Sequence, residues 1–257
     1  MHELPCQDGR FFEFPGLSAE ARLVHAFAAK PWNLAPHRGR DCERAVERRR
    51  VICDVLGVSF ERLTSPRQVH GAEMLRVEKE DIGRGRLGRD DAVPFVDGLL
   101  TDRPGVPLIL LSADCPLVLA FDPLHPAVGI VHASWLGTVA GITTRLIERM
   151  RAEFLSDPST LRAAIAPCAG PCCYEVGPEV RRIFRTRMPE ADVFFAPRDH
   201  KYLLDLPSAN VAQLTAAGVP PHRIEVAGAC TICDTRFWSH RRDGPEAGRN
   251  ALVAALR

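Results

Sequence analysis

The stretch DGLLTDRPGVPLILLSADCPLVLAFDPLHPAVGIVHASWLGTVAGI, residues Asp97–Ile142, contains most of the features that predict the fold. Three short apolar runs, at 106–111, 116–121 and 127–131, are separated by turn-forming residues, which is typical of buried strands. From 137 to 155 the apolar positions recur at three- and four-residue steps instead, and this period predicts one helix. The stretch therefore predicts adjacent strands followed by a helix that covers them.

The segments on either side of this core have weaker patterns of the same two kinds. No internal repeat, low-complexity tract or linker interrupts them, so we expect a single domain over residues 1–257. The periodicity predicts strands at 21–29, 67–77, 163–166 and 224–228, and helices at 42–56, 177–187 and 207–217.

The composition is that of an ordinary soluble protein. Of 257 residues, 46% are hydrophobic and 25% are charged, and 33 basic residues nearly cancel 32 acidic ones. This balance gives no reason to expect nucleic acid or an anionic membrane as a partner. No apolar run approaches the roughly 18 residues of a membrane span, and the N-terminus lacks a secretion signal. We therefore expect a cytoplasmic location.

Nine cysteines are unevenly distributed along the chain. Because no export signal is present, we expect reduced thiols rather than a disulfide framework. A zinc ribbon pairs two Cys-x-x-Cys knuckles, whereas this chain has only one, Cys230–Cys233. The pattern therefore favours small packing side chains over a closed zinc site for Cys168, Cys172, Cys173, Cys230 and Cys233.

His70, Cys115 and His132 each lie near a predicted strand boundary. Two imidazoles and one thiolate suit Zn²⁺, and three protein ligands leave a fourth position open, as in catalytic zinc sites. Spacing alone favours a plainer alternative, in which the histidines are hydrogen-bonded and the cysteine is buried. A third alternative is Cys115 as a nucleophile with either histidine as its base.

A series of motifs in consistent order, from about Leu23 to the end, resembles one known family. This is the laccase-domain or multicopper polyphenol oxidase family, better described as purine nucleoside phosphorylases with adenosine deaminase activity. The motifs are QVHG (Gln68–Gly71), DGLLT (Asp97–Thr101), SADCPLVL (Ser112–Leu119), VHASWLGT (Val131–Thr138), CCYEVGPEV (Cys172–Val180), DLPSANVAQLTAAGV (Asp205–Val219), CTIC (Cys230–Cys233), SHRRDG (Ser239–Gly244) and GR (Gly248–Arg249).

The resemblance implies a fold and a metal site. The fold is a single α+β domain with two mixed β-sheets covered by helices, similar to the catalytic domain of cytotoxic necrotizing toxins. The family's metal ligands correspond to His70, Cys115 and His132, with zinc as the expected metal and copper as its alternative. A thiolate that binds metal is occupied, so the resemblance argues against Cys115 as a nucleophile.

The resemblance also implies a function. It predicts a zinc-dependent purine nucleoside enzyme that cleaves adenosine, inosine and methylthioadenosine with phosphate, giving the free base and ribose 1-phosphate, and that deaminates adenosine. The expected partners are a purine nucleoside and phosphate, and the expected state is a monomer or small homo-oligomer. The candidate catalytic residues are Asp97, Asp114 and Cys115, and the candidate substrate-binding residues are Lys30, Arg48, Gln68, Ser134 and Arg241.

Two positions depart from the family pattern. Leu136 replaces the arginine of the family's HAGWRG motif, and Lys30 stands where an arginine is usual. A guanidinium can bind phosphate through two parallel hydrogen bonds, whereas lysine offers a point charge and leucine none. These departures predict weaker phosphate binding.

Three other functions remain compatible with the sequence. A copper-dependent polyphenol oxidase would need several copper centres, yet only two of the nine histidines belong to the predicted ligand set. A peptidoglycan-precursor editing hydrolase would act on an amino-sugar peptide. A degenerate paralogue would bind its ligand without turnover.

Overall fold

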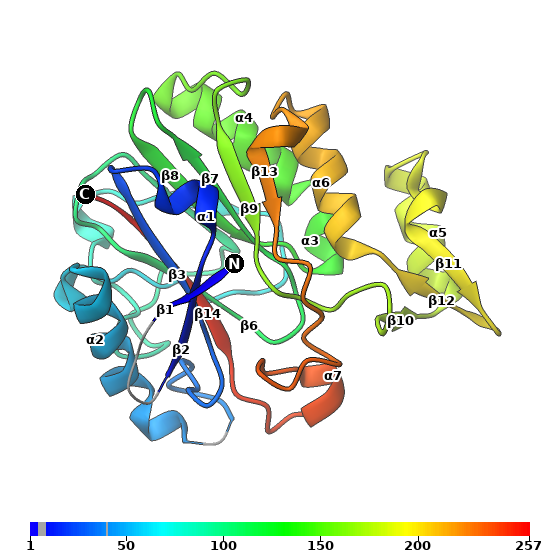
Figure 1. Cartoon of the computed structure of the whole chain (residues 1–257), viewed down its shortest axis with the longest axis horizontal. Helices are drawn as coiled ribbons and strands as arrows, with labels where there is room; N and C mark the ends of the chain where they lie inside the picture. Colours follow the sequence, from blue (N-terminus) through cyan, green and yellow to red (C-terminus); the bar gives the residue numbers. More distant parts are fainter. Residues whose placement is uncertain (5–8, 40) are drawn as a thin grey trace.

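Two β-sheets stacked face to face form the centre of the computed structural model, which describes residues 1–4, 9–39 and 41–257 (Figure 1). Cys6 lies outside the described residues. The chain is α+β, as predicted. No helix among the described residues has both the length and the apolar character needed to span a membrane.

The first sheet has five strands, and all of its pairs are antiparallel. The apolar run predicted at 106–111 forms one edge strand, shifted by one or two residues. The strands lie in the order β1 (His2–Leu4), β2 (Arg10–Glu13), β3 (Leu23–Ala29), β14 (Asn250–Leu256) and β6 (Leu108–Ser112).

The second sheet has six strands and is mixed, with parallel pairs only at its two edges. The prediction of two mixed sheets is therefore wrong for the first sheet, and a small third sheet was not predicted. The second sheet has the order β13 (Ile224–Val226), β9 (Arg162–Ile165), β7 (Leu117–Asp122), β8 (Ala127–His132), β5 (Gly98–Thr101) and β4 (Met74–Arg76). The third is antiparallel, with β10 (Glu175–Val176), β12 (Lys201–Leu204) and β11 (Phe195–Arg198).

Apolar side chains fill the space between the two large sheets, and helices cover the outer faces. Phe27 and Leu252 of the first sheet pack with Leu119 and Ile130 of the second. The helices α4 (Ile142–Phe154) and α6 (Leu206–Ala216) cover the second sheet, and α2 (Ala45–Leu56) covers the first (Figure 1). The shorter helices are α1 (Pro15–Ser18), α3 (Trp135–Val139), α5 (Pro178–Arg187) and α7 (His240–Asp243).

Two predicted elements differ from the structure because of left-handed backbone. The helix predicted over 137–155 is divided into α3 and α4 at Gly141, whose φ is 78°. The strand predicted over 67–77 is reduced to β4, and the residues before it form a loop in which His70 has a φ of 62°. Both conformations interrupt a regular hydrogen-bond ladder, and for a histidine the left-handed region is uncommon.

Candidate metal centre and cavity

His70, Cys115 and His132 meet at one end of the second sheet. His70 lies in the loop before β4, Cys115 lies in the turn between β6 and β7, and His132 is the last residue of β8. One donor atom from each side chain lies within 4.8 Å of the other two. The sequence prediction that these three residues come together is thus consistent with the geometry, which can hold one metal ion.

The Asp97 carboxylate fixes the positions of His132 and of the loop that carries His70. It is fully buried and accepts a hydrogen bond from His132 Nδ1 at 2.8 Å. It also accepts backbone N–H groups from Val69, His70 and Gly71 at 2.8–3.0 Å. The bond to Nδ1 leaves Nε2 of His132 as the ring nitrogen that could bind a metal ion, and the three N–H bonds fix the loop that carries His70.

The three donors also shift one another's protonation. Burial raises the pKa of Cys115, but the neighbouring imidazoles outweigh it and lower that pKa to about 6. Burial likewise lowers the pKa of His132, but the Cys115 thiolate and the Asp97 carboxylate raise it to about 9. These two shifts favour a thiolate beside an imidazolium, because each charge stabilises the other. An ion that binds here must displace the imidazolium proton.

A cavity of about 490 Å³ opens over the three donors. This size lies within the usual range for a small-molecule site. Its lining is strongly cationic, which favours an anionic ligand, since guanidinium groups match phosphate and carboxylate geometry. The arginines that line it are Arg38, Arg49, Arg67, Arg89, Arg241 and Arg249.

Asp114 lies on the cavity wall next to Cys115 and joins the loop of Thr231 to α7. Its φ of 99° places it in the left-handed region, and only 8% of its surface is exposed. One carboxylate oxygen accepts the hydroxyl of Thr231 at 2.6 Å, and the other accepts the backbone N–H of Arg241 at 2.7 Å. The turn that carries Cys115 is therefore tied to the C-terminal loops.

Of the predicted substrate-binding residues, Gln68 and Arg241 line the cavity and Ser134 does not. The Gln68 amide exchanges two hydrogen bonds with the Leu111 backbone, at 2.8 and 2.9 Å, so its polar atoms already have protein partners. Ser134 is buried and accepts the N–H of Gly137 at 3.1 Å, which makes it the N-cap of α3.

Lys30 and Arg48 are also absent from the lining, as is Leu136. Lys30 forms an ion pair with Asp243 at 3.1 Å, and Arg48 is buried and donates to the Asn33 carbonyl at 3.3 Å. Leu136 is 46% exposed on α3. Lys30 and Leu136, the two departures from the family pattern, therefore lie outside the cavity, whose lining contains six arginines.

Several lining residues were not singled out from the sequence. Arg67 directly precedes the QVHG motif and Arg249 is the second residue of the GR motif, so the motifs could have identified both. His37, Arg38 and Arg89 come from loops without any recognisable signal. Their placement depends on how distant loops meet, which no local pattern encodes.

Comparisons with known proteins agree with the motif resemblance. Residues 23–257 match the family described as multi-copper polyphenol oxidoreductase laccase. The chain is 40% identical over 220 residues to the purine nucleoside phosphorylase YlmD of Geobacillus stearothermophilus, covering 84% of this chain and 80% of that protein. It is 31% identical over 220 residues to the adenosine deaminase RL5 of an unknown prokaryotic organism, covering 84% of each.

Solved structures share the whole architecture. The crystal structure of YlmD from Geobacillus stearothermophilus superposes with a TM-score of 0.91 at 34% identity, covering 99% of this chain and 98% of that one. A Bacillus licheniformis hypothetical protein, YfiH, superposes with a TM-score of 0.90 at 29% identity, covering 97% of each. Sequence and structure together show that the chain belongs to the multi-copper polyphenol oxidoreductase laccase family.

Proposed function

We propose that this chain is a zinc-dependent purine nucleoside enzyme. The reactions are phosphorolysis of adenosine, inosine and methylthioadenosine to free base and ribose 1-phosphate, and deamination of adenosine. Relatives named purine nucleoside phosphorylase and adenosine deaminase support this class of substrate. The observation that carries the proposal is the position of His70, Cys115 and His132 under an arginine-lined cavity.

His70, Cys115 and His132 would hold the zinc ion. Two imidazoles and a thiolate are donors that zinc prefers, and the Asp97 carboxylate behind His132 is the outer partner that metal-binding histidines usually have. When bound, zinc acts as a Lewis acid and lowers the pKa of a bound water toward neutrality.

For phosphorolysis, the arginines of the lining would bind and orient phosphate. Phosphate attacks the ribose C1′ while the bond to the purine breaks, and the departing base takes up a proton. Arg67, Arg241 and Arg249 come from separate segments of the wall, so they could donate hydrogen bonds to the phosphate from different sides. This gives phosphate binding without Lys30 or an arginine at Leu136.

For deamination, water replaces the amino group at C6 of adenosine and ammonia leaves with a proton. Of the two candidate carboxylates, Asp114 lines the cavity, so it would be the one to exchange a proton with a bound molecule. Asp97 is fully enclosed by His132 and three backbone N–H groups. We therefore assign Asp97 a positioning role and Asp114 the proton-transfer role.

The test is an assay of purified protein with adenosine and with inosine, each with and without phosphate, before and after zinc removal. We expect hypoxanthine from inosine only with phosphate, and inosine from adenosine only with zinc. His70→Ala should abolish both, whereas His200→Ala, at an exposed position, should not.

Other outcomes would identify the alternatives. Oxidation of a phenol that requires added copper would favour the polyphenol oxidase. Hydrolysis restricted to amino-sugar peptides would favour the editing hydrolase. Nucleoside binding without any product would indicate a degenerate paralogue, and each of these results would contradict the proposed function.

A further inference from the structure

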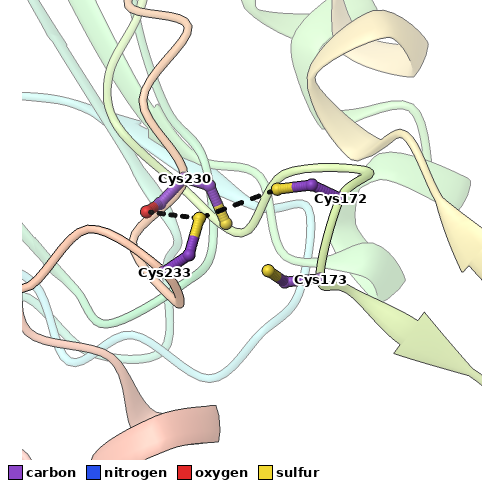
Figure 2. Close-up of side chains that lie close together, drawn as sticks. All are labelled: Cys172, Cys173, Cys230 and Cys233. Atoms are coloured by element: carbon purple, nitrogen blue, oxygen red, sulfur yellow. Dashed lines mark hydrogen bonds between the residues drawn. The ribbon is translucent and has the colours of Figure 1, made fainter.

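Four cysteine side chains converge at a second place in the molecule (Figure 2). Cys172 and Cys173 come from the loop between β9 and β10, and Cys230 and Cys233 come from the loop after β13. The four sulfur atoms lie within 4.8 Å of one another, and the Sγ atoms of Cys172 and Cys233 are 3.8 Å apart.

This convergence corrects the expectation that these cysteines are packing residues. Cys168 and Cys230 are buried, in keeping with that expectation, but Cys172 and Cys233 are exposed and Cys173 is partly exposed. An exposed thiol contributes little to packing, so burial does not account for the four sulfur atoms lying together.

We propose that Cys172, Cys173, Cys230 and Cys233 form a second metal site that holds Zn²⁺ through four thiolates. A tetrahedral zinc with Zn–S bonds of about 2.3 Å has sulfur atoms about 3.8 Å apart. One pair in the cluster already has this separation, and the others are close enough to reach it by side-chain rotation. This inference rests on the geometry of the cysteines and is independent of the proposed function.

A backbone group beside Cys230 is arranged as a zinc-bound thiolate requires. The N–H of Gly170 donates to Cys230 Sγ at 3.2 Å. Such a donor stabilises a thiolate ligand and fixes its direction. Gly170 favours this approach, because a Cβ there would make a tight contact of 3.1 Å with the Cys230 Cβ.

A single disulfide explains the cluster less well. A single Cys172–Cys233 bond would leave Cys173 and Cys230 beside it without a role. A four-thiolate site uses all four residues and satisfies the preference of soft sulfur ligands for zinc. The sequence pattern did not predict this site, because an adjacent Cys-Cys pair takes the place of the second Cys-x-x-Cys knuckle.

The position of the cluster gives the ion a structural role near the cavity. Thr231, which lies between the two knuckle cysteines, donates to the Asp114 carboxylate at 2.6 Å. On the other loop, the N–H of Ala169 donates to the Asp114 carbonyl at 2.7 Å. Zinc would lock these two loops together and so fix Asp114, the neighbour of Cys115.

The first experiment counts metal in the full chain, purified under reducing conditions with Zn²⁺ supplied during expression. We expect two zinc ions per chain in the wild type, one in Cys115→Ala and one in Cys233→Ser. Cys42→Ser, at a partly exposed cysteine outside both groups, should keep two. A wild type that binds zinc only at the four cysteines would count against the proposed function. A wild type that binds zinc only at the Cys115 site would count against this inference.

A second experiment does not depend on whether Cys233→Ser folds. Cys115→Ala retains the four cysteines, so Co²⁺ exchanged into that variant should give the strong thiolate-to-cobalt charge-transfer absorption of a four-sulfur tetrahedral site. Titration of the zinc-loaded variant should show these thiols protected until a chelator is added. An absence of charge-transfer absorption, or freely reactive thiols in the presence of zinc, would overturn the proposal, as would a disulfide that persists under reducing conditions.

Discussion

The Asp97 carboxylate lies 2.8 Å from Nδ1 of His132, and three backbone N–H groups of the His70 loop complete its shell. One buried side chain thus sets the ring orientation of one candidate ligand and the backbone position of another. Asp97 therefore supports the candidate metal centre.

Replacing Asp97 should therefore weaken metal binding without removing a ligand. We expect Asp97→Asn to lower zinc affinity by about 10–100-fold, since the amide provides a weaker partner for His132 Nδ1. Competition with a chromogenic chelator measures the change, and Asp199→Asn, at an exposed aspartate, is the matched control. Equal affinity in wild type and Asp97→Asn would show that the carboxylate has no supporting role.

Phosphate binding should depend on an arginine of the cavity wall. We expect Arg67→Ala to raise the phosphate KM for inosine cleavage by at least about tenfold, because truncating a charged partner of a bound anion typically costs about 2 kcal/mol or more. Arg198→Ala, at an exposed arginine outside the lining, should leave the KM unchanged. The measurement is initial rate against phosphate concentration, and equal KM values would place the phosphate elsewhere.

In contrast to Arg67, the family arginine that is missing at Leu136 should have little effect on phosphate binding. Leu136 is exposed on α3 and does not line the cavity, so Leu136→Arg should leave the phosphate KM within about twofold of the wild type. The same kinetic titration tests this. A large fall in KM would mean that α3 approaches the bound phosphate more closely than the lining indicates.

His25 should make folding stability sensitive to acid. Burial lowers its pKa from 6.5 to about 4, and its Nε2 accepts the backbone N–H of Phe14 at 2.9 Å. Between these pH values the unfolded chain binds a proton that the folded chain does not, so stability falls as the pH is lowered through that window. Above pH 6.5 the group is neutral in both states and contributes no pH dependence.

Denaturant titrations at several pH values measure this effect. The full shift corresponds to about 3 kcal/mol of unfolding free energy. His25→Gln keeps an acceptor for the Phe14 N–H but cannot titrate, so its stability should fall less steeply than that of the wild type between pH 6.5 and 4. Identical slopes would show that His25 is not responsible.

The elements that sequence predicted well are those with a clear period. The runs that became β6, β7 and β8 are rich in branched apolar residues and are bounded by turns, and α2 ends at Leu56 as predicted. By contrast β14 was missed. It is buried on both faces and contains three alanines, so it has neither alternation nor strong β propensity.

The candidate site was predictable only in part. The three candidate metal donors were assigned through their motifs, because their spacing alone was not distinctive. The left-handed backbone at His70 and Asp114 and the arginines of the wall depend on tertiary structure, and no residue pattern shows them. The likeness of the fold to the necrotizing toxins stays a prediction.

The place of β14 in the first sheet also affects how quickly the chain can fold. β3 and β6 do not pair with each other, and β14 joins them through Leu252, which pairs with Phe27 on one side and Leu110 on the other. These partners are far apart in sequence, so a large loop must close before the central pairing forms, and such topologies fold slowly. Until β14 arrives, the apolar edges of β3 and β6 are exposed to intermolecular pairing. Stopped-flow refolding should therefore be slow, and its yield should fall as the protein concentration rises.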